Sequence, residues 1–461
     1  MKHWRFSPSR ASADFVAGLR YQDIPEEVIE AVKKYILDWI GCAIGGAVHP
    51  ASGPIKSLVE TLGGKDQADI IGGTGSNAFL AALSHAYYGH ILEMDDVERR
   101  SITHPATVVV PAALAVAGRA GKTGEDLILS VIGGYEVLLR IGAAIVPAHY
   151  EVFHTTSTAG VFGAAMAAGK MLGLDRQYLN WALGNAGSLA SGLMQFLQEF
   201  LQGGMSKFLH AGTASAQGVL VALLAEKGLG GAEDILEGEK GFFAGFARQE
   251  VDERIFGDFG KRWRTLDVSV KAYPCCRHTH SAIDAALEIG NRAGGRSLKE
   301  IRLFTYRTAV GFVGCRNPVN SRQARFSMTY CIASALLRGA PVECHFTDAA
   351  VVEKPVSDLE KSIQVIVDDE IDALVPEYWP ARVEVVTEDG EKLVAQANIS
   401  KGDPENPLDW DAVGKKFRMQ TEGIITGATQ DELIGLCRKL ETVPSAGVLV
   451  STVNTTFLKR C

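Results

Sequence analysis

The sequence contains no run of eighteen apolar residues, so no segment is predicted to cross a membrane. The first residues, Met1 to Phe6, lack the apolar core of a signal peptide. Eight cysteines are scattered over 461 residues, which is too sparse for a disulfide framework and suits a reducing compartment. These absences favour a cytoplasmic protein.

An excess of basic residues is also missing. The chain has 46 Lys and Arg against 54 Asp and Glu, a formal net charge of −8. Binding to a phosphate backbone requires clustered positive charge, so we expect no nucleic-acid partner. The hydrophobic content of 47% and charged content of 22% are typical of a globular protein, long enough here for two or three domains.

Motifs for cofactors and metals are weak. The glycine-rich turn at Gly72 to Gly75 lacks the Gly-Lys-Ser/Thr ending of a phosphate loop. Cys275 and Cys276, with His278 and His280 nearby, resemble part of a metal cluster, but no second group with ligand spacing accompanies them. A Ser-His-Asp arrangement is not evident either. We therefore expect neither a cofactor nor a metal.

Hydrophobic patterning predicts a mainly α protein. Small-residue helical segments fill residues 106–190 and 207–226, and helical patterning returns after residue 409. Apart from a short apolar strand before the Gly72 turn, strand-like segments appear after about residue 265, at Val268–Tyr273, Ile301–Phe312, Ala381–Thr387 and Lys392–Ala397. The last two are joined by an Asp-Gly turn typical of a hairpin. The pattern predicts an all-helical body carrying an inserted α+β lid.

The most concentrated polar stretch covers residues 89–105, between two apolar segments. It includes four carboxylates, two guanidinium groups and two imidazoles, with Asp95, Asp96 and His104 among them. Acids and bases confined between core-forming segments suggest titratable groups at the rim of a pocket. A solvated loop whose charges pair with one another is the alternative.

Three further polar positions interrupt apolar helices: His154, Lys207, and the segment 271–280. A histidine or lysine at any one of them is more often a structural residue than a catalyst. Taken together with the 89–105 stretch, they provide imidazoles and carboxylates for acid–base chemistry and cations for anchoring an anion. The combination indicates cofactor-free proton transfer on a polyanionic small molecule.

Several ordered motifs make the chain resemble the MmgE/PrpD family, which includes 2-methylcitrate dehydratases, cis-aconitate decarboxylases and iminodisuccinate epimerases. The resemblance covers nearly the whole chain, and no single motif is decisive. The motifs are His90 with Glu93 to Asp96 and His104-Pro105, Phe153 to Gly163, Lys207 to Gly212, Lys271 to Cys276 with His280, and Phe326 to Tyr330.

The resemblance implies a helical domain, residues 1–266 completed by 403–461, and an α+β lid at 267–402. It also implies a homodimer without cofactor and an active site between body and lid. We predict catalytic roles for Asp95, Asp96, His104, His154, Lys207 and Lys271, and substrate contacts from Glu93, Arg100, Tyr150, Arg277 and His280.

Family members act at the carbon α or β to a carboxylate, so the predicted substrate is a small di- or tricarboxylic acid. The decarboxylase branch has an aspartate and a threonine where this chain has Glu93 and Val97, and this chain carries one extra residue before His104. We expect a hydro-lyase of the 2-methylcitrate dehydratase type. Epimerisation, decarboxylation, and a non-catalytic relative that keeps only the fold and dimer remain alternatives.

Overall fold

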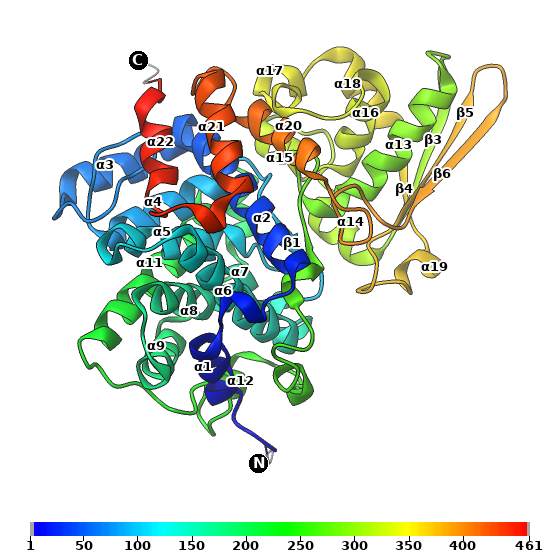
Figure 1. The fold of residues 1–461 in the computed structure, drawn as a ribbon. Coiled ribbons are helices and arrows are strands. Elements are labelled where there is room, and N and C mark those ends of the chain that lie inside the picture. Colours follow the sequence, from blue (N-terminus) through cyan, green and yellow to red (C-terminus); the bar gives the residue numbers. More distant parts are fainter. Residues whose placement is uncertain (1–3, 459–461) are drawn as a thin grey trace.

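A computed structural model describes residues 4–458; Met1 to His3 and Lys459 to Cys461 lie outside the described residues. The chain forms a helical body and a smaller lobe that contains a sheet (Figure 1). The main helices of the body are α1 (Pro8–Gly18), α2 (Glu26–Val48), α3 (Gly53–Leu62), α4 (Ala78–Ile91), α5 (Ala106–Ala120), α6 (Gly124–Ile145), α8 (Gly160–Leu172), α9 (Arg176–Leu189), α11 (Ser206–Glu226), α20 (Trp410–Thr421), α21 (Gly427–Arg438) and α22 (Val448–Thr456). The predicted mainly α class is confirmed.

Small residues allow the helices of the body to approach closely. A Cβ atom at Gly46 of α2 would lie 2.0 Å from the carbonyl oxygen of Tyr88 in α4, and one at Gly218 of α11 would lie 2.4 Å from the Cβ of Ala164 in α8. Only glycine fits at such contacts. The helices α20 and α21, from the C-terminal end of the chain, pack against α2, so both ends of the chain build the body.

Two body helices, α6 and α11, are long and apolar enough by composition to span a membrane. Within the fold, however, 94% of the most apolar window of α6 and 61% of that of α11 are buried inside the protein. Helix α11 packs on α4 and α8, and α6 packs on α8. This burial is what the core helices of a folded domain show.

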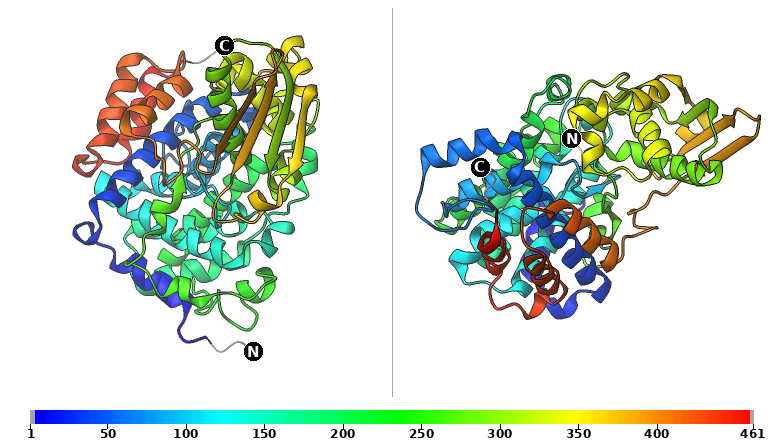
Figure 2. Two further views of the ribbon diagram at one scale, coloured as in Figure 1. Left: turned by 90° about the vertical axis from the view of Figure 1, so that its right-hand side faces the viewer. Right: turned by 90° about the horizontal axis from the view of Figure 1, so that it is seen from above.

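The lobe combines helices with a mixed sheet, in which some neighbouring strands are parallel and others antiparallel. Its elements are α13 (His280–Ala293), β3 (Leu298–Thr305), α14 (Arg307–Val313), α15 (Ser321–Arg325), α16 (Met328–Arg338), α17 (Asp348–Val351), α18 (Lys354–Ser362), β4 (Ile363–Val367), α19 (Asp369–Asp372), β5 (Ala381–Thr387) and β6 (Lys392–Ala397). Within the described residues the larger sheet has the order β4-β3-β5-β6, with β3 and β4 parallel. Helix α13 covers one face, and the other faces outward (Figure 2).

The predicted hairpin of β5 and β6 is confirmed, with Val385 opposite Leu393 and a turn at Gly390, whose φ is +87°. By contrast, the prediction of a strand over Ile301–Phe312 is wrong in its second half. The strand β3 ends at Thr305, and α14 follows because the carboxylate of Asp372 accepts a hydrogen bond from the backbone N–H of Arg307 at 2.8 Å.

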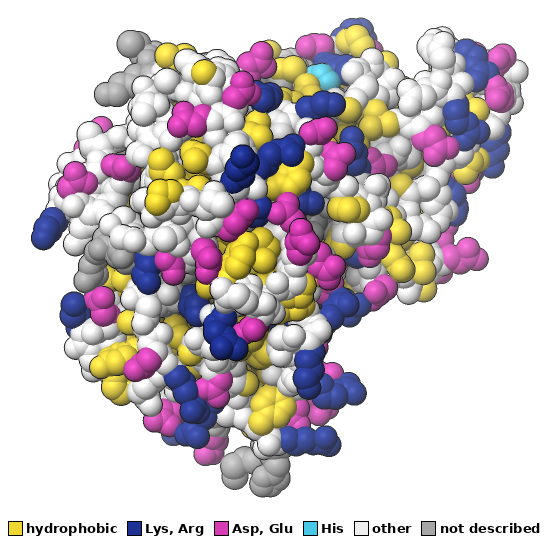
Figure 3. All heavy atoms as spheres, viewed as in Figure 1, with side chains coloured by type: hydrophobic (Ala, Val, Ile, Leu, Met, Phe, Trp, Pro, Cys, Tyr) yellow, Lys and Arg dark blue, Asp and Glu magenta, His cyan; other side chains and the backbone are white. Residues whose placement is uncertain are grey.

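Two chain crossings join body and lobe, and they lie side by side. The two-residue strands β1 (Val97–Glu98) and β2 (Val268–Ser269) pair antiparallel, and the N–H of Val270 donates to the carbonyl of Gly402 at 2.9 Å. A Cβ atom at Gly402, where φ is +93°, would lie 1.9 Å from the carbonyl oxygen of Val270. The pairing brings the polar 89–105 stretch next to the segment that begins at Lys271. On the outer surface, acidic and basic side chains are interspersed (Figure 3).

Candidate active site

The polar stretch between α4 and α5 adopts strained backbone conformations. Glu93 has φ +55° and Ile102 has φ +49°, in the left-handed region that non-glycine residues seldom adopt. Both side chains line the same cavity. Such strain persists only where the surrounding structure enforces it, and it concentrates at functional sites.

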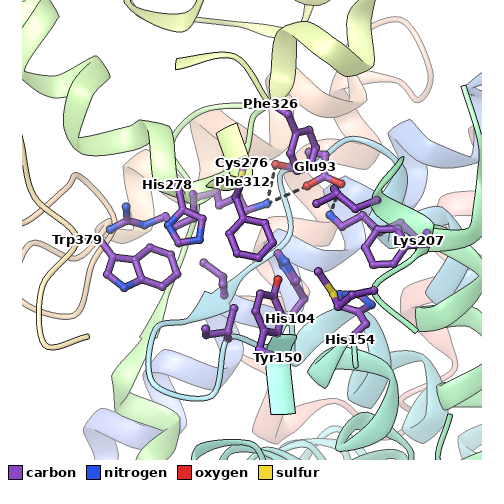
Figure 4. A pocket seen from close by; sticks show the side chains of 17 residues that line it. Glu93, His104, Tyr150, His154, Lys207, Cys276, His278, Phe312, Phe326 and Trp379 are labelled. Carbon is purple, nitrogen blue, oxygen red and sulfur yellow. Dashed lines mark hydrogen bonds and ion pairs between the residues drawn. The ribbon is translucent and has the colours of Figure 1, made fainter. Parts of the chain in front are cut away.

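This cavity lies between the body and the lobe and receives side chains from distant parts of the chain (Figure 4). Its volume is about 40 Å³, room for about three water molecules. A small polycarboxylic acid is larger, so binding requires the walls to move apart. The lining residues are Glu93, Val97, Ile102, His104, Tyr150, His154, Met194, Phe196, Leu197, Lys207, Lys271, Cys276, Arg277, His278, Phe312, Phe326 and Trp379.

Two lysines share one carboxylate at the upper side of the cavity in Figure 4. Lys207 forms an ion pair with Glu93, and the Nζ of Lys271 lies 3.6 Å from the other oxygen of Glu93. Lys271 also donates to the backbone carbonyl of Glu93 at 3.0 Å. Burial alone would raise the pKa of Glu93, but Lys207 and Lys271 lower it to about 2. Burial lowers the pKa of Lys271, but Glu93 and Asp95 more than offset this and raise it. Glu93 is therefore a carboxylate that holds two ammonium groups.

His104 has one ring nitrogen fixed by the backbone. Its Nδ1 lies 2.8 Å from the carbonyl oxygen of Asp96 and 3.2 Å from the carboxylate of Asp95. A carbonyl oxygen can only accept, so Nδ1 carries the proton, and Nε2 presents a lone pair. Burial, together with Lys271, lowers the pKa of His104 to about 4, which keeps the imidazole neutral at pH 7.

Asp95 lies behind His104 and does not line the cavity. Its Oδ2 is 2.7 Å from Nδ1 of His90. Burial alone would raise the pKa of Asp95, but His90, His104 and Lys271 hold it well below its usual value. The carboxylate is therefore placed to orient the imidazoles of His90 and His104.

The carboxylate of Asp96 points the other way. Its Oδ1 accepts from the N–H of Ala106 at 2.9 Å, and its Oδ2 accepts from the hydroxyl of Tyr135 at 2.7 Å. Burial raises the pKa of Asp96 to about 8. The predicted catalytic role of Asp96 must be corrected: its carboxylate anchors the start of α5, and only its backbone carbonyl reaches His104.

Two predicted substrate contacts also lie outside the cavity. The side chain of Arg100 is 49% exposed and pairs with Glu377 at 2.5 Å. His280 is buried, with its ring centroid 5.1 Å from that of Tyr273. These positions correct the substrate-binding roles predicted for Arg100 and His280.

The other predicted residues do line the cavity. His154, at the start of the short helix α7 (Thr155–Thr158), places its Nδ1 3.1 Å from Nδ1 of His210. Tyr150 packs against Phe312, with ring centroids 5.3 Å apart. Arg277 forms an ion pair with Asp403 through Nη2, whereas its buried Nη1 has no hydrogen-bond partner among the described residues. That free donor is positioned to receive an anion.

Sequence reasoning missed the aromatic wall of the cavity. The rings of Phe312 and Trp379 enclose that of His278, at centroid distances of 5.6 Å and 4.1 Å. Phe196 and Phe326 complete the apolar lining. These residues come from separate loops and helix ends, and no local pattern in the sequence links them.

The same wall separates the cavity from a larger one of about 840 Å³. Ile102, His278 and Trp379 line both. Arg99, Arg100 and Arg264 line the larger cavity together with acidic residues. The shared side chains are thus the barrier that a molecule from this side must displace to reach His104.

Among the described residues, the atoms of His90, Asp95 and His104 lie within 4.8 Å of one another and could in principle hold a metal ion. The 2.7 Å separation of His90 and Asp95 is that of a hydrogen bond. Two ligands of one zinc ion, each about 2.0–2.2 Å from it, lie farther apart at a tetrahedral angle. Cys275 and His278 contact Thr279 and Tyr306 instead, at 3.0 Å and 2.5 Å. The geometry is that of a hydrogen-bonded cluster.

Comparison with known proteins gives consistent matches over the chain. The family model of the MmgE/PrpD N-terminal domain matches residues 10–254, and that of the MmgE/PrpD C-terminal domain matches residues 273–442. A cis-aconitate decarboxylase of Aspergillus terreus is 27% identical over 95% of this chain and 94% of that protein. The cis-aconitate decarboxylase of Homo sapiens is 27% identical over 98% of this chain and 95% of its own length. A cis-aconitate decarboxylase-like protein of Aspergillus oryzae is 25% identical over 96% of each chain.

Proposed function

This chain belongs to the MmgE/PrpD family, and from that premise we propose that it is a lyase that releases carbon dioxide from a small polycarboxylic acid. The observation that carries the proposal is the fixed tautomer of His104, which presents a neutral Nε2 in a cavity with two ammonium groups. The curated relatives named above are decarboxylases, which supports this outcome over others.

The chemistry follows from where charge develops. Breaking a bond next to a carboxylate builds negative charge on the substrate, and Lys207 and Lys271 are placed to stabilise it. The proton that replaces the lost carboxylate would pass through His104 or His154. None of these steps requires a cofactor.

Dehydration, the outcome that the sequence favours, needs an acid to protonate the leaving hydroxyl group. Asp95 is held ionised behind His104, and the carboxylate of Asp96 faces Tyr135. Neither can supply that proton, so the hydro-lyase loses support. Epimerisation stays as a second candidate, because His104 and His154 line one cavity and could serve opposite faces of a carbon atom.

The charges of the site point to a substrate that carries fewer carboxylates than cis-aconitate does. The three cations that line the cavity, Lys207, Lys271 and Arg277, face the carboxylates of Glu93, Asp95 and Asp403. Arg99, outside the cavity, also lies 3.6 Å from Asp403. A tricarboxylate would add three negative charges to a cluster that is already balanced, in low-dielectric surroundings where unpaired charge is expensive. A dicarboxylate with an apolar substituent fits both the free Nη1 of Arg277 and the aromatic wall.

A panel of acids followed by NMR tests the proposal. It comprises cis-aconitate, methylcitrate, citrate, iminodisuccinate, and dicarboxylates with and without an apolar substituent. We expect release of carbon dioxide from at least one acid, and a rise in melting temperature with acids that bind. Loss of water or inversion of a stereocentre would indicate the other reactions. Binding without turnover would support a non-catalytic relative. A protein that neither binds nor turns over any acid of the panel would overturn the proposal.

A further inference from the structure

A second hollow lies on the outer side of α11, separate from the cavity. It is an open groove of about 770 Å³. Its walls come from the segment after α9 and from the first turns of α11, and include Ser191, Gly192, Gln198, Gln202, His210 and Thr213. We refer to it as the outer groove. Among the described residues, Phe196 alone lines both this groove and the cavity.

Two imidazoles bridge the wall between these spaces. His154 lines the cavity, and His210 lines the outer groove. Their Nδ1 atoms are 3.1 Å apart, and their ring centroids are 5.3 Å apart. At that distance, one Nδ1 carries a proton and the other accepts it. From this geometry we propose that His154 and His210 form a proton relay between the buried cavity and solvent.

Neighbouring contacts hold the pair in place. The N–H of His154 donates to the carbonyl of Gly192 at 3.0 Å, and the hydroxyl of Ser157 donates to the carbonyl of His210 at 3.4 Å. The ring of Phe196 lies 5.1 Å from the centroids of both imidazoles. Burial lowers the pKa of His210 to about 4 and that of His154 well below its usual value, so both rings are neutral at pH 7.

The relay conserves protons at each step. Nε2 of His154 takes a proton from a molecule in the cavity, and the Nδ1–H of the resulting imidazolium passes its proton to Nδ1 of His210. His210 then loses its Nε2 proton to water in the outer groove. The reverse sequence delivers a proton from solvent to the cavity. Rotation of the rings or exchange of the shared proton restores the starting tautomers.

The inference rests on the proposed function, because the relay supplies the proton that decarboxylation needs. Replacing a carboxylate with hydrogen consumes one proton from solvent in each turnover. The cavity volume of about 40 Å³ leaves room for only about three water molecules, so few waters are available there to carry that proton. A pair of imidazoles that reaches the surface removes the need to open the site.

The first test does not depend on turnover. NMR of substrate-free protein labelled with ¹⁵N-histidine should show one protonated and one unprotonated Nδ1 in the pair, with coupling across the hydrogen bond. The variants His154→Gln and His210→Gln assign the signals. If both rings carry their protons only on Nε2, the relay is refuted, whatever the enzyme's activity.

The second test uses the full-length protein and the dicarboxylate of the panel that it turns over fastest. For His210→Ala, the rate of solvent-proton incorporation should fall about tenfold or more, and free imidazole entering the open groove should restore part of it. The rate of solvent-proton incorporation should fall equally in His210→Gln. Gln202→Ala, in the same groove, should keep the wild-type rate and show no response to imidazole.

Full activity in His210→Ala, or a loss that imidazole does not restore while the NMR signature is missing, would overturn the relay. A wild-type protein that turns over no acid, but shows the shared proton, would instead count against the proposed function alone.

Discussion

Glu93 is the residue whose removal tests the charge balance of the cavity most sharply. In the variant Glu93→Gln, Lys207 loses the carboxylate with which it is paired. Lys271 keeps the backbone carbonyl of residue 93 and has Asp95, at 3.9 Å, as its remaining carboxylate partner. The side chains of Glu93, Lys207 and Lys271 are at most 6% exposed, so solvent screens these charges little.

Breaking a buried ion pair by removing one partner costs about 3–5 kcal/mol. We therefore expect the ligand-free variant to melt several degrees below the wild type. The same change frees two ammonium groups for an anion. Citrate should then raise the melting temperature of Glu93→Gln more than that of the wild type, and at 100 times its Kd it should restore about 2.7 kcal/mol.

Glu136→Gln is the matched control. Glu136 forms a fully buried ion pair with Arg140 and also accepts hydrogen bonds from Thr265, away from the cavity. Differential scanning fluorimetry should show a similar loss of stability in this variant but a wild-type response to citrate. Equal responses of both variants to citrate, or a Glu93→Gln protein as stable as the wild type without ligand, would refute the reasoning.

Other predictions concern titration and anchoring. The pKa of His104 is lowered to about 4 and that of Lys271 is raised. We therefore expect kcat/KM to stay constant from about pH 5 to above pH 9 and to fall below about pH 5, where His104 becomes protonated. A midpoint of the pH profile near 6.5 would contradict this. Asp96→Asn should keep activity, because the amide can still bond to Tyr135 and the N–H of Ala106. The pKa of Asp96 is raised to about 8, so the stability that this group gives the wild type is lost as the pH rises toward 8. The melting temperature of Asp96→Asn should therefore rise relative to that of the wild type between pH 5 and 8. A constant difference in melting temperature over this range would argue against it. Arg277→Gln should raise KM more than it lowers kcat in steady-state assays, because a free guanidinium donor is removed; an unchanged KM would exclude substrate binding at Nη1.

Local pattern was sufficient for much of the fold. The β5–β6 hairpin was predictable because alternating apolar residues flank a turn with Gly390 at positive φ. Close helix contacts were predictable from glycines such as Gly46, since small residues are placed where backbones meet. The end of β3 was not predictable, because it depends on Asp372, which is 65 residues from the N–H that it accepts from.

In the candidate site, the sequence identified the types of side chain but not their directions. Asp95 and Asp96 are adjacent and chemically equivalent in the sequence, yet one faces the imidazoles and the other faces Tyr135. The left-handed backbone at Glu93 lies in the same stretch, and nothing in the sequence marks a glutamate for that conformation. The wall formed by His278 and Trp379 likewise depends on tertiary packing.

The most direct measurement of the central claim is deuterium incorporation from D₂O next to a carboxylate of the turned-over acid, compared between the wild type and His104→Asn. The asparagine amide can keep the hydrogen bond to the Asp96 carbonyl in place of Nδ1, while Nε2 is removed. We expect one deuterium per turnover in the wild type and, at an unchanged melting temperature, a rate of deuterium incorporation in the variant that is almost zero, because turnover itself is lost. Incorporation at the wild-type rate in His104→Asn would contradict it.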